Sequence, residues 1–154
     1  MAERALSPVI GVVLLLAITI TLAGVVGLTL ISLQPNDAPI QASISADVNL
    51  TTDTFRFVHD GGDPIDVHTL EVTIFVDDEP IRHQPRVPYF SQTGFQSGPT
   101  GPFNRESNNV WKAGESASLA LACSNEPKPA DATIIEIHFT SDGNPIDTVK
   151  ILVD

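Results

Sequence analysis

The stretch Leu6–Leu33 reads LSPVIGVVLLLAITITLAGVVGLTLISL, and it decides the fold of this chain. The sequence carries no charged residue between Arg4 and Asp37. A run of about 18 apolar residues is long enough to cross a membrane as a helix. This stretch of about 28 residues would be ~42 Å long as a helix, whereas the hydrocarbon core of a bilayer is only ~30 Å thick. The sequence therefore predicts a single long N-terminal helix that exceeds what a membrane requires.

Three interpretations of this helix compete. A secretory signal peptide has an apolar core of only ~7–15 residues and then a small-residue cleavage site, and no such site follows before Pro35. A plain membrane anchor fits the length. A helix that starts in a membrane and later packs against copies of itself in a filament fits equally well.

The residues around the start of the run favour the filament interpretation. Met1–Ala5 reads MAERA, and Ser7–Gly11 reads SPVIG. This start resembles the class III signal peptide of archaeal type IV pilins, and the SPVIG segment resembles the haloarchaeal members. The resemblance implies that a prepilin peptidase cuts between Ala5 and Leu6, so that residues 1–5 form a leader peptide and Leu6 becomes the mature N-terminus.

A second motif matches the same family further along the chain. Phe57–Asp66 reads FVHDGGDPID, which resembles the His-x-Gly-Gly-Asp hairpin of the β-domain of these pilins. The chain departs from bacterial type IV pilins, which carry a Glu near the start of the mature helix. Since Leu6–Ile10 holds no acidic residue, assembly would rest on apolar packing.

The helix is expected to span residues 6–34, because Pro35 ends it. Gly11, Gly24 and Gly27 each cost about 1 kcal/mol relative to Ala inside a helix. Small residues compensate where apolar helices approach closely, so these glycines are candidate packing positions. The alternative is that membrane helices simply tolerate Gly.

Beyond a linker over residues 35–39, the pattern changes to an alternation of apolar and polar residues, which is typical of half-buried strands. Turn-forming clusters separate these runs. The alternating apolar positions are Ile40–Val48, Leu70–Val76, Thr133–Phe139 and Val149–Val153. The sequence therefore predicts an α+β protein in which residues 40–154 form a small antiparallel, Ig-like β-sandwich head.

The composition limits the partners of this head. The net charge is −11, from 19 acidic against 8 basic residues, and it argues against nucleic-acid binding. An acidic surface with few lysines suits a halophilic source, because salt screens the repulsion between its charges. Cys123 stands alone, so an intrachain disulfide is excluded, and its apolar neighbours favour a buried position.

The remaining candidate sites are weak. His59, Asp60, Asp63 and Asp66 cluster around a Gly-Gly turn, but their spacing is not that of a calcium loop, so no metal or other cofactor is predicted. No nucleophile motif or catalytic set is visible, so an enzyme is not expected. Asn49-Leu50-Thr51 is an N-glycosylation acceptor. The Pro- and Gly-rich segment 85–109 would form either an outward face of the head or a cover over a sheet edge.

These features predict a structural pilin. The precursor would lie in the cytoplasmic membrane, and the mature subunit would polymerise with itself into a surface filament, for which the resemblance to pilins implies an adhesive role. The partners would be other copies, the prepilin peptidase and the membrane. The alternative is a membrane-tethered surface or solute-binding β-domain that never polymerises. An archaellin of the motility filament is disfavoured by the SPVIG start.

Overall fold

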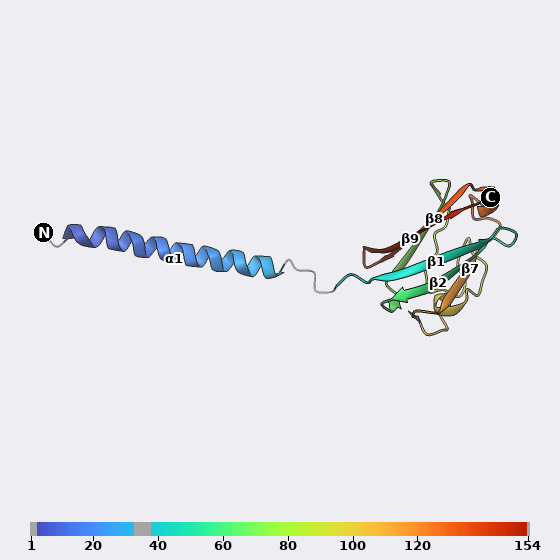
Figure 1. Cartoon of the computed structure of the whole chain (residues 1–154), viewed down its shortest axis with the longest axis horizontal. Helices are drawn as coiled ribbons and strands as arrows, with labels where there is room; N and C mark the ends of the chain where they lie inside the picture. Colours follow the sequence, from blue (N-terminus) through green and yellow to red (C-terminus); the bar gives the residue numbers. More distant parts are fainter. Residues whose placement is uncertain (1–2, 33–37, 154) are drawn as a thin grey trace. The chain divides into compact units, whose positions relative to one another are not determined.

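The computed structural model describes the backbone of residues 3–32 and 38–153. The chain divides into two compact units, residues 1–38 and 39–154, and each is described by itself. The described part of the first unit contains the helix α1 (Glu3–Ser32) (Figure 1). It begins three residues before the expected start at Leu6, and it encloses Pro8. The expected end of the helix at residues 33–34 and most of the expected linker lie outside the described residues.

The second unit, the head, is built from short strands. They are β1 (Ala42–Asn49), β2 (Thr54–Gly62), β3 (Ile65–Asp66), β4 (Leu70–Val76), β5 (Glu79–Pro80), β6 (Val110–Trp111), β7 (Ser116–Ala120), β8 (Ile134–Ser141) and β9 (Asn144–Leu152). Two 3-10 turns, η1 (Gly101–Phe103) and η2 (Pro129–Asp131), lie in the connections.

The strands form two main antiparallel sheets, ordered β1-β2-β7 and β5-β4-β8-β9, while β3 pairs with β6. Alternate residues of β2, β4 and β8 are buried, as expected for strands with one face on a shared core. The Ile44 amide of β1 donates to Asp147 Oδ2 of β9 at 2.7 Å, which joins the edges of the two sheets. This arrangement confirms the predicted α+β class with an antiparallel β-sandwich.

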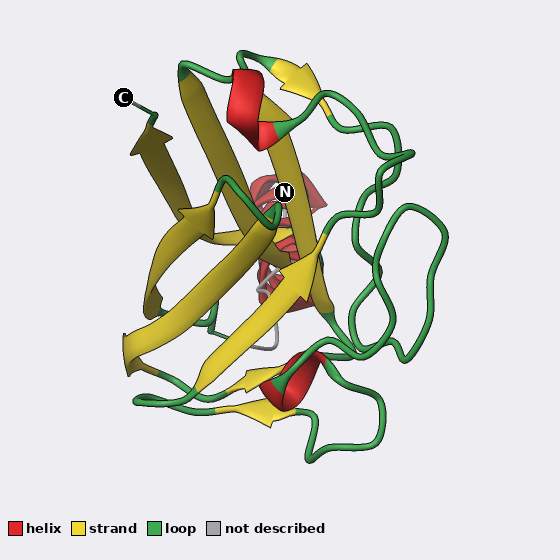
Figure 2. Cartoon of the chain, turned by 90° about the vertical axis from the view of Figure 1, so that its right-hand side faces the viewer, coloured by secondary structure: helices red, strands yellow, loops and turns green. Residues whose placement is uncertain are grey.

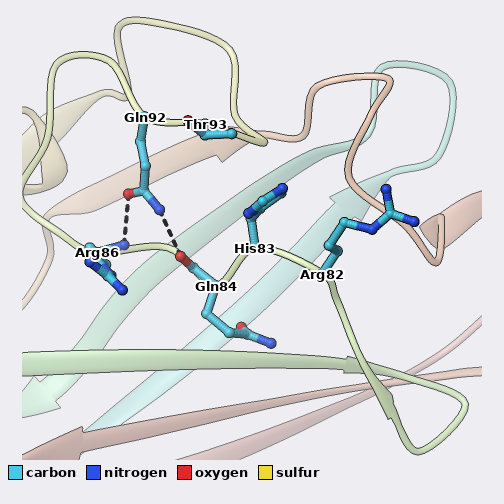
Figure 3. Close-up of a pocket in the computed structure, with 6 residues that line it drawn as sticks. All are labelled: Arg82, His83, Gln84, Arg86, Gln92 and Thr93. Carbon is cyan, nitrogen blue, oxygen red and sulfur yellow. Dashed lines mark hydrogen bonds between the residues drawn. The ribbon is translucent and has the colours of Figure 1, made fainter.

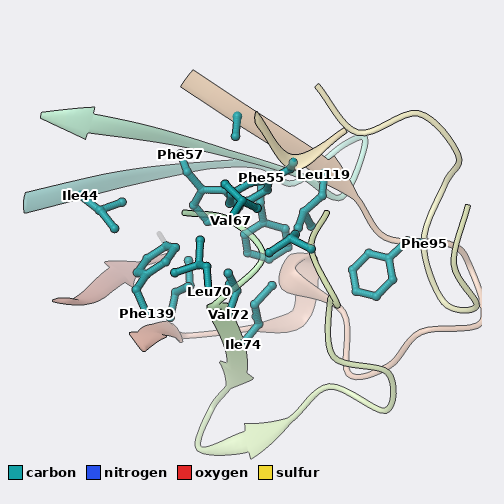
Figure 4. Packing of buried hydrophobic residues seen from close by; sticks show 14 of the residues in the cluster. Ile44, Phe55, Phe57, Val67, Leu70, Val72, Ile74, Phe95, Leu119 and Phe139 are labelled. Carbon is teal, nitrogen blue, oxygen red and sulfur yellow. The ribbon is translucent and has the colours of Figure 1, made fainter. Parts of the chain in front are cut away.

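Aromatic rings fill the space between the sheets (Figure 4). Phe57 of β2 meets Phe139 of β8 edge-on, with ring centroids 5.5 Å apart. Phe103 of η1 lies 5.6 Å from Phe57 and 5.2 Å from Trp111 of β6. Aromatic contacts of this kind stabilise a core beyond the area they bury. The core therefore holds together strands that are distant in the sequence, and it includes the connection that carries η1.

The irregular segment between β5 and β6 covers the sheets rather than standing away from them. Its side chains Tyr89, Phe95 and Phe103 are buried, whereas Phe90 is 53% exposed. Figure 2 shows the irregular connections of the head gathered along one side of the strands. Of the two expectations for segment 85–109, the structure favours the cover.

The expectation for Cys123 is wrong, because its thiol-bearing side chain is exposed. Leu119 and Leu121 point into the core, and the same alternation would bury Cys123 if the strand continued. However, β7 ends at Ala120, and the backbone amide of Asn125 donates to the backbone carbonyl of Ala122 at 3.0 Å. This turn carries Cys123 out of the sheet.

Candidate functional site

The first candidate site is the apolar surface of α1. Pro8–Gly27 is long and apolar enough to cross a membrane. Its described large side chains are 54–67% exposed. These side chains lie on all sides of the helix: Val9, Ile10, Val12, Val13, Leu14, Leu15, Leu16, Ile18, Ile20, Leu22, Val25 and Val26. A helix that is apolar all round needs a lipid or protein environment.

The helix also satisfies its own polar side chains over the described range. The Thr19 hydroxyl donates to the Leu15 carbonyl at 2.7 Å, and the Thr21 hydroxyl donates to the Ala17 carbonyl at 3.0 Å. Back-bonding of this kind leaves no unpaired hydroxyl for an apolar environment to desolvate. Thr19 and Thr21 are therefore compatible with a membrane and equally with a packed helical core.

The three predicted packing glycines are not required by the fold of the single chain. A Cβ added at Gly11, Gly24 or Gly27 would meet nothing within 4 Å. At ~100° per residue, Gly24 and Gly27 lie about 60° apart on one face, and Gly11 lies roughly 140–160° away from them. The small positions are thus on two sides of the helix, which is where a helix surrounded by several neighbours would use them.

The predicted processing site lies at the beginning of α1. Ala5 and Leu6 have helical backbone, and their side chains are outside the described residues. Pro8 is the sixth residue of this helix. Proline lacks an amide hydrogen and its ring crowds the carbonyl four residues earlier, so here it disturbs the turn that contains Arg4.

The second candidate site is the motif around His59, which fixes the chain where it enters the head. The backbone amide of Asp63 donates to the backbone carbonyl of Gln41 at 2.8 Å, and the backbone amide of Gln41 donates to Asp63 Oδ2 at 3.1 Å. Gly62 has a φ of 106°, and a Cβ there would lie 2.2 Å from the Gln41 carbonyl oxygen. Only glycine allows this approach without strain. We call Gln41, His59, Gly62 and Asp63 the head clamp.

His59 supports the head clamp from inside. Its Nε2 lies 2.9 Å from the Asp63 carbonyl oxygen, and since a carbonyl can only accept, Nε2 is the donor. The ring is fully buried and meets Trp111 edge-on, with centroids 5.7 Å apart. The Glu115 carbonyl accepts both from the Trp111 indole and from the His59 amide, each at 3.0 Å. The motif therefore ties β2 to the loop before β7 as well as to Gln41.

The acidic residues of this motif do not converge on one point. Asp63 is bound to Gln41, while Asp60 Oδ1 accepts from the Ser45 hydroxyl at 3.2 Å and Asp66 Oδ1 accepts from the His68 amide at 2.9 Å. Among the described residues, no group of three or more His, Cys, Asp or Glu side chains is arranged to hold a metal ion. The motif thus serves the backbone of the head.

Asn49 is exposed at the end of β1, as an acceptor for glycosylation must be. Its Oδ1 accepts from the amides of Thr51 and Thr52 at 3.0 and 3.2 Å. An N-glycan attaches to Nδ2 of the asparagine. These two hydrogen bonds involve Oδ1, so they do not occupy the atom that would be glycosylated.

Comparison with known proteins agrees with the geometry of α1. Residues 4–44 match the family model described as the N-terminal region of archaeal type IV pilins. This match confirms the resemblance of the N-terminal segment to that of archaeal type IV pilins, whereas the likeness of the SPVIG start to haloarchaeal members stays a prediction. The chain is also 29% identical over 124 residues to an uncharacterized protein of Archaeoglobus fulgidus, covering 79% of this chain and 76% of the relative.

The sequence motifs and the site correspond only in part. The apolar stretch and the His-Gly-Gly-Asp motif both stand out in the sequence. However, the partner of the motif, Gln41, was missed, because nothing in a single sequence links residues 41 and 63. The family match over residues 4–44 includes Gln41.

Proposed function

We propose that this chain is the structural subunit of an archaeal type IV pilus. The precursor lies in the cytoplasmic membrane through α1, and the mature subunit polymerises with other copies into an adhesive cell-surface filament. The observation that carries this proposal is the uncovered apolar helix, Pro8–Gly27, inside a segment that matches the archaeal pilin N-terminal region. In a filament, neighbouring helices would replace the lipid around it.

Processing between Ala5 and Leu6 by a prepilin peptidase would improve the helix. If the mature chain starts at Leu6, Pro8 becomes its third residue and lies in the first turn. Amides of the first turn have no intrahelical partner, so proline is tolerated there. Removal of residues 1–5 therefore removes the turn that Pro8 disturbs.

Close packing at the glycines would hold the filament core together. Lipid tails and leucine side chains are equally apolar, so helices leaving the membrane gain stability mainly from close contact and dispersion. Gly11, Gly24 and Gly27 have open space beside them in the single chain, which is where a neighbouring backbone can approach. Their positions on two sides of α1 would suit a core in which each helix has several neighbours.

The head clamp would then attach the head firmly to the chain that leaves the filament core. It holds Gln41, close to the end of the segment that joins α1 to the sandwich, with two hydrogen bonds and the close approach at Gly62. The head would form the outer surface of the filament, with its net acidic charge suited to a haloarchaeal setting and an N-glycan on Asn49.

Substitution of the glycines tests the proposal. Gly24→Leu and Gly27→Leu keep α1 apolar and improve its helix propensity, so membrane insertion should persist. Because a Cβ at either position would meet nothing within 4 Å in the single chain, a loss of filaments with normal membrane insertion would indicate contacts between copies. We expect membrane-associated precursor at the parental level and few filaments by electron microscopy.

Val25→Leu is the matched control, because it adds one methylene to a residue that is already large and exposed. It should assemble like the parent. If both glycine variants form filaments as abundantly as Val25→Leu, the proposal that neighbouring helices pack closely at these glycines is wrong. If the parent itself forms no filaments when produced with a complete pilus machinery, the chain is a membrane-tethered surface module.

A further inference from the structure

We propose that a basic hollow on the head binds an acidic polysaccharide, through carboxylates spaced along its chain. The hollow has a volume of about 420 Å³, within the ~300–1,000 Å³ of small-molecule sites. It lies on the segment that follows β5 and is lined by Arg82, His83, Gln84, Arg86, Gln92 and Thr93 (Figure 3).

The charge of the hollow is opposite to that of the protein. The chain has only 8 Lys and Arg residues against 19 acids, and two of the eight are Arg82 and Arg86. Both are exposed, and neither forms an ion pair within the part of the chain that the structure describes. By contrast, Lys128 pairs with Asp53 and Lys150 pairs with Glu136. The two guanidinium groups are therefore available to an external anion.

Amide side chains fix the backbone that carries these arginines. Gln92 bridges the hollow: its Oε1 accepts from the Arg86 amide at 2.8 Å, and its Nε2 donates to the Gln84 carbonyl at 2.7 Å (Figure 3). Gln84 in turn makes two hydrogen bonds with the Ile74 backbone of β4, at 2.8 and 2.9 Å. The segment has no regular structure of its own, yet it is attached to the sheet.

The neighbouring residue His83 is held as firmly. Asn125 is fully buried, and its side chain accepts from the His83 amide at 2.9 Å and donates to the His83 carbonyl at 3.0 Å. A Cβ on Gly94 would lie 2.6 Å from the His83 Cβ, so Gly94 lets the next loop close against the histidine. A site whose backbone is fixed in this way loses little entropy when a ligand binds.

The arrangement of the arginines indicates the kind of anion. Figure 3 shows Arg86 at one end of the hollow and Arg82 at the other, with His83 between them. Guanidinium groups placed apart suit a ligand that repeats its charge along a chain better than a single small anion. Arginine forms strong, paired hydrogen bonds with carboxylates, and the exposed Thr93 offers a hydroxyl to the hydroxyls of a sugar.

A second copy of this chain fits the hollow less well. Several of its acids already bind the backbone of their own head. Asp77 accepts from the amides of Thr133 and Ile134, and Asp147 accepts from the Ile44 amide. An acidic polysaccharide has no such internal partners for its carboxylates. Binding of such a polysaccharide would give the filament surface an adhesive site. This role of the hollow in adhesion rests on the proposed function.

Calorimetry with the purified full-length chain in detergent micelles tests the site separately from filament assembly. The probe is trigalacturonate at about 1 M salt, where we expect the head to be stable and where only charges within ~3 Å, in direct contact, still interact. We expect saturable binding that Arg82→Gln and Arg86→Gln each weaken about tenfold. Arg56→Gln is the control, because Arg56 is an exposed arginine on β2 outside the hollow and should leave the affinity unchanged.

Fluorescence of the buried Trp111 verifies that each variant is folded. No binding of trigalacturonate, or binding that neither arginine variant weakens, would overturn the proposal. So would equal binding of neutral maltotriose, or full competition by sulfate at the same concentration, which would indicate a site for any small anion. If the arginine variants instead change self-association without any effect on the saccharide, the hollow is a contact between copies. Filaments of these variants should look normal, so a failure here leaves the pilin proposal intact.

Discussion

Gly62→Ala should strongly destabilise the head, because the head clamp has no room for a methyl group at this position. The new Cβ would lie 2.2 Å from the Gln41 carbonyl oxygen and 2.7 Å from the Ala42 Cα. Both neighbours are backbone atoms, so the contact can be relieved only by moving β1 away from β2. The φ of 106° adds strain of about 1–3 kcal/mol for a non-glycine residue.

Moving Gln41 away also loses its two hydrogen bonds with Asp63, at about 0.5–1.5 kcal/mol each. Together these effects predict that the free energy of unfolding falls by about 3 kcal/mol. For a domain of this size, that corresponds to a fall in Tm of roughly 10–20 °C.

Gly61→Ala is the matched control. Gly61 precedes Gly62 in the same strand, its φ is not in the left-handed region, and a Cβ there would meet nothing within 4 Å. We expect a change within about 0.5 kcal/mol. Urea unfolding of the full-length chain, followed by Trp111 fluorescence, measures both variants. Equal stabilities of Gly61→Ala and Gly62→Ala would refute the reasoning, because the two sites differ only in backbone conformation and space.

Four further predictions concern titratable groups and salt. Burial raises the pKa of Tyr89 from 10 to about 12, so ultraviolet absorbance of the chain's one tyrosine should show ionisation above the usual pH 10. The free energy of unfolding should fall as the pH rises from 10 to about 12, because the phenol of the unfolded chain loses its proton first. Among the described residues this hydroxyl has no hydrogen-bond partner although it is buried. Tyr89→Phe should therefore leave stability unchanged or raise it by up to ~1 kcal/mol in urea unfolding, and a clear loss would contradict this. Hydrogen bonds from Lys150 and His138 lower the pKa of Glu136 below its usual 4.5. The contribution of Glu136 to folding stability is therefore present above pH ~4.5 and is lost as the pH falls through the lowered pKa. Glu136→Gln should reduce Tm near neutral pH and not in acid. The acidic surplus predicts that Tm falls as salt is lowered from about 1 M to about 0.1 M, and a constant Tm would contradict a halophilic origin.

The sequence predicted those features that depend on local pattern. The uncharged run before Pro35 indicated α1, and the alternation in Leu70–Val76 indicated a strand with one buried face. These signals are strong because helix and strand periodicities are properties of neighbouring residues. The fold class followed from the order of one apolar helix and several alternating strands.

The features that the sequence did not predict depend on contacts between distant residues. Gln41 and Asp63 meet only because β1 and β2 pair with a register shift between Ser43 and Ile44. Arg82 and Arg86 define a hollow only because Gln92 and Asn125 hold the backbone around them. Cys123 was misplaced for the same reason, since the end of β7 decides which way its side chain points.

The central claim is that α1 is trimmed and then packed into a filament core. The most direct measurement is mass spectrometry of filaments sheared from producing cells, digested to identify the N-terminal peptide of this chain. We predict that the filament fraction contains this protein with Leu6 as its first residue and that the membrane fraction retains some precursor with residues 1–5. Filaments that lack this chain, or that contain it with Met1–Ala5 still attached, would contradict the claim.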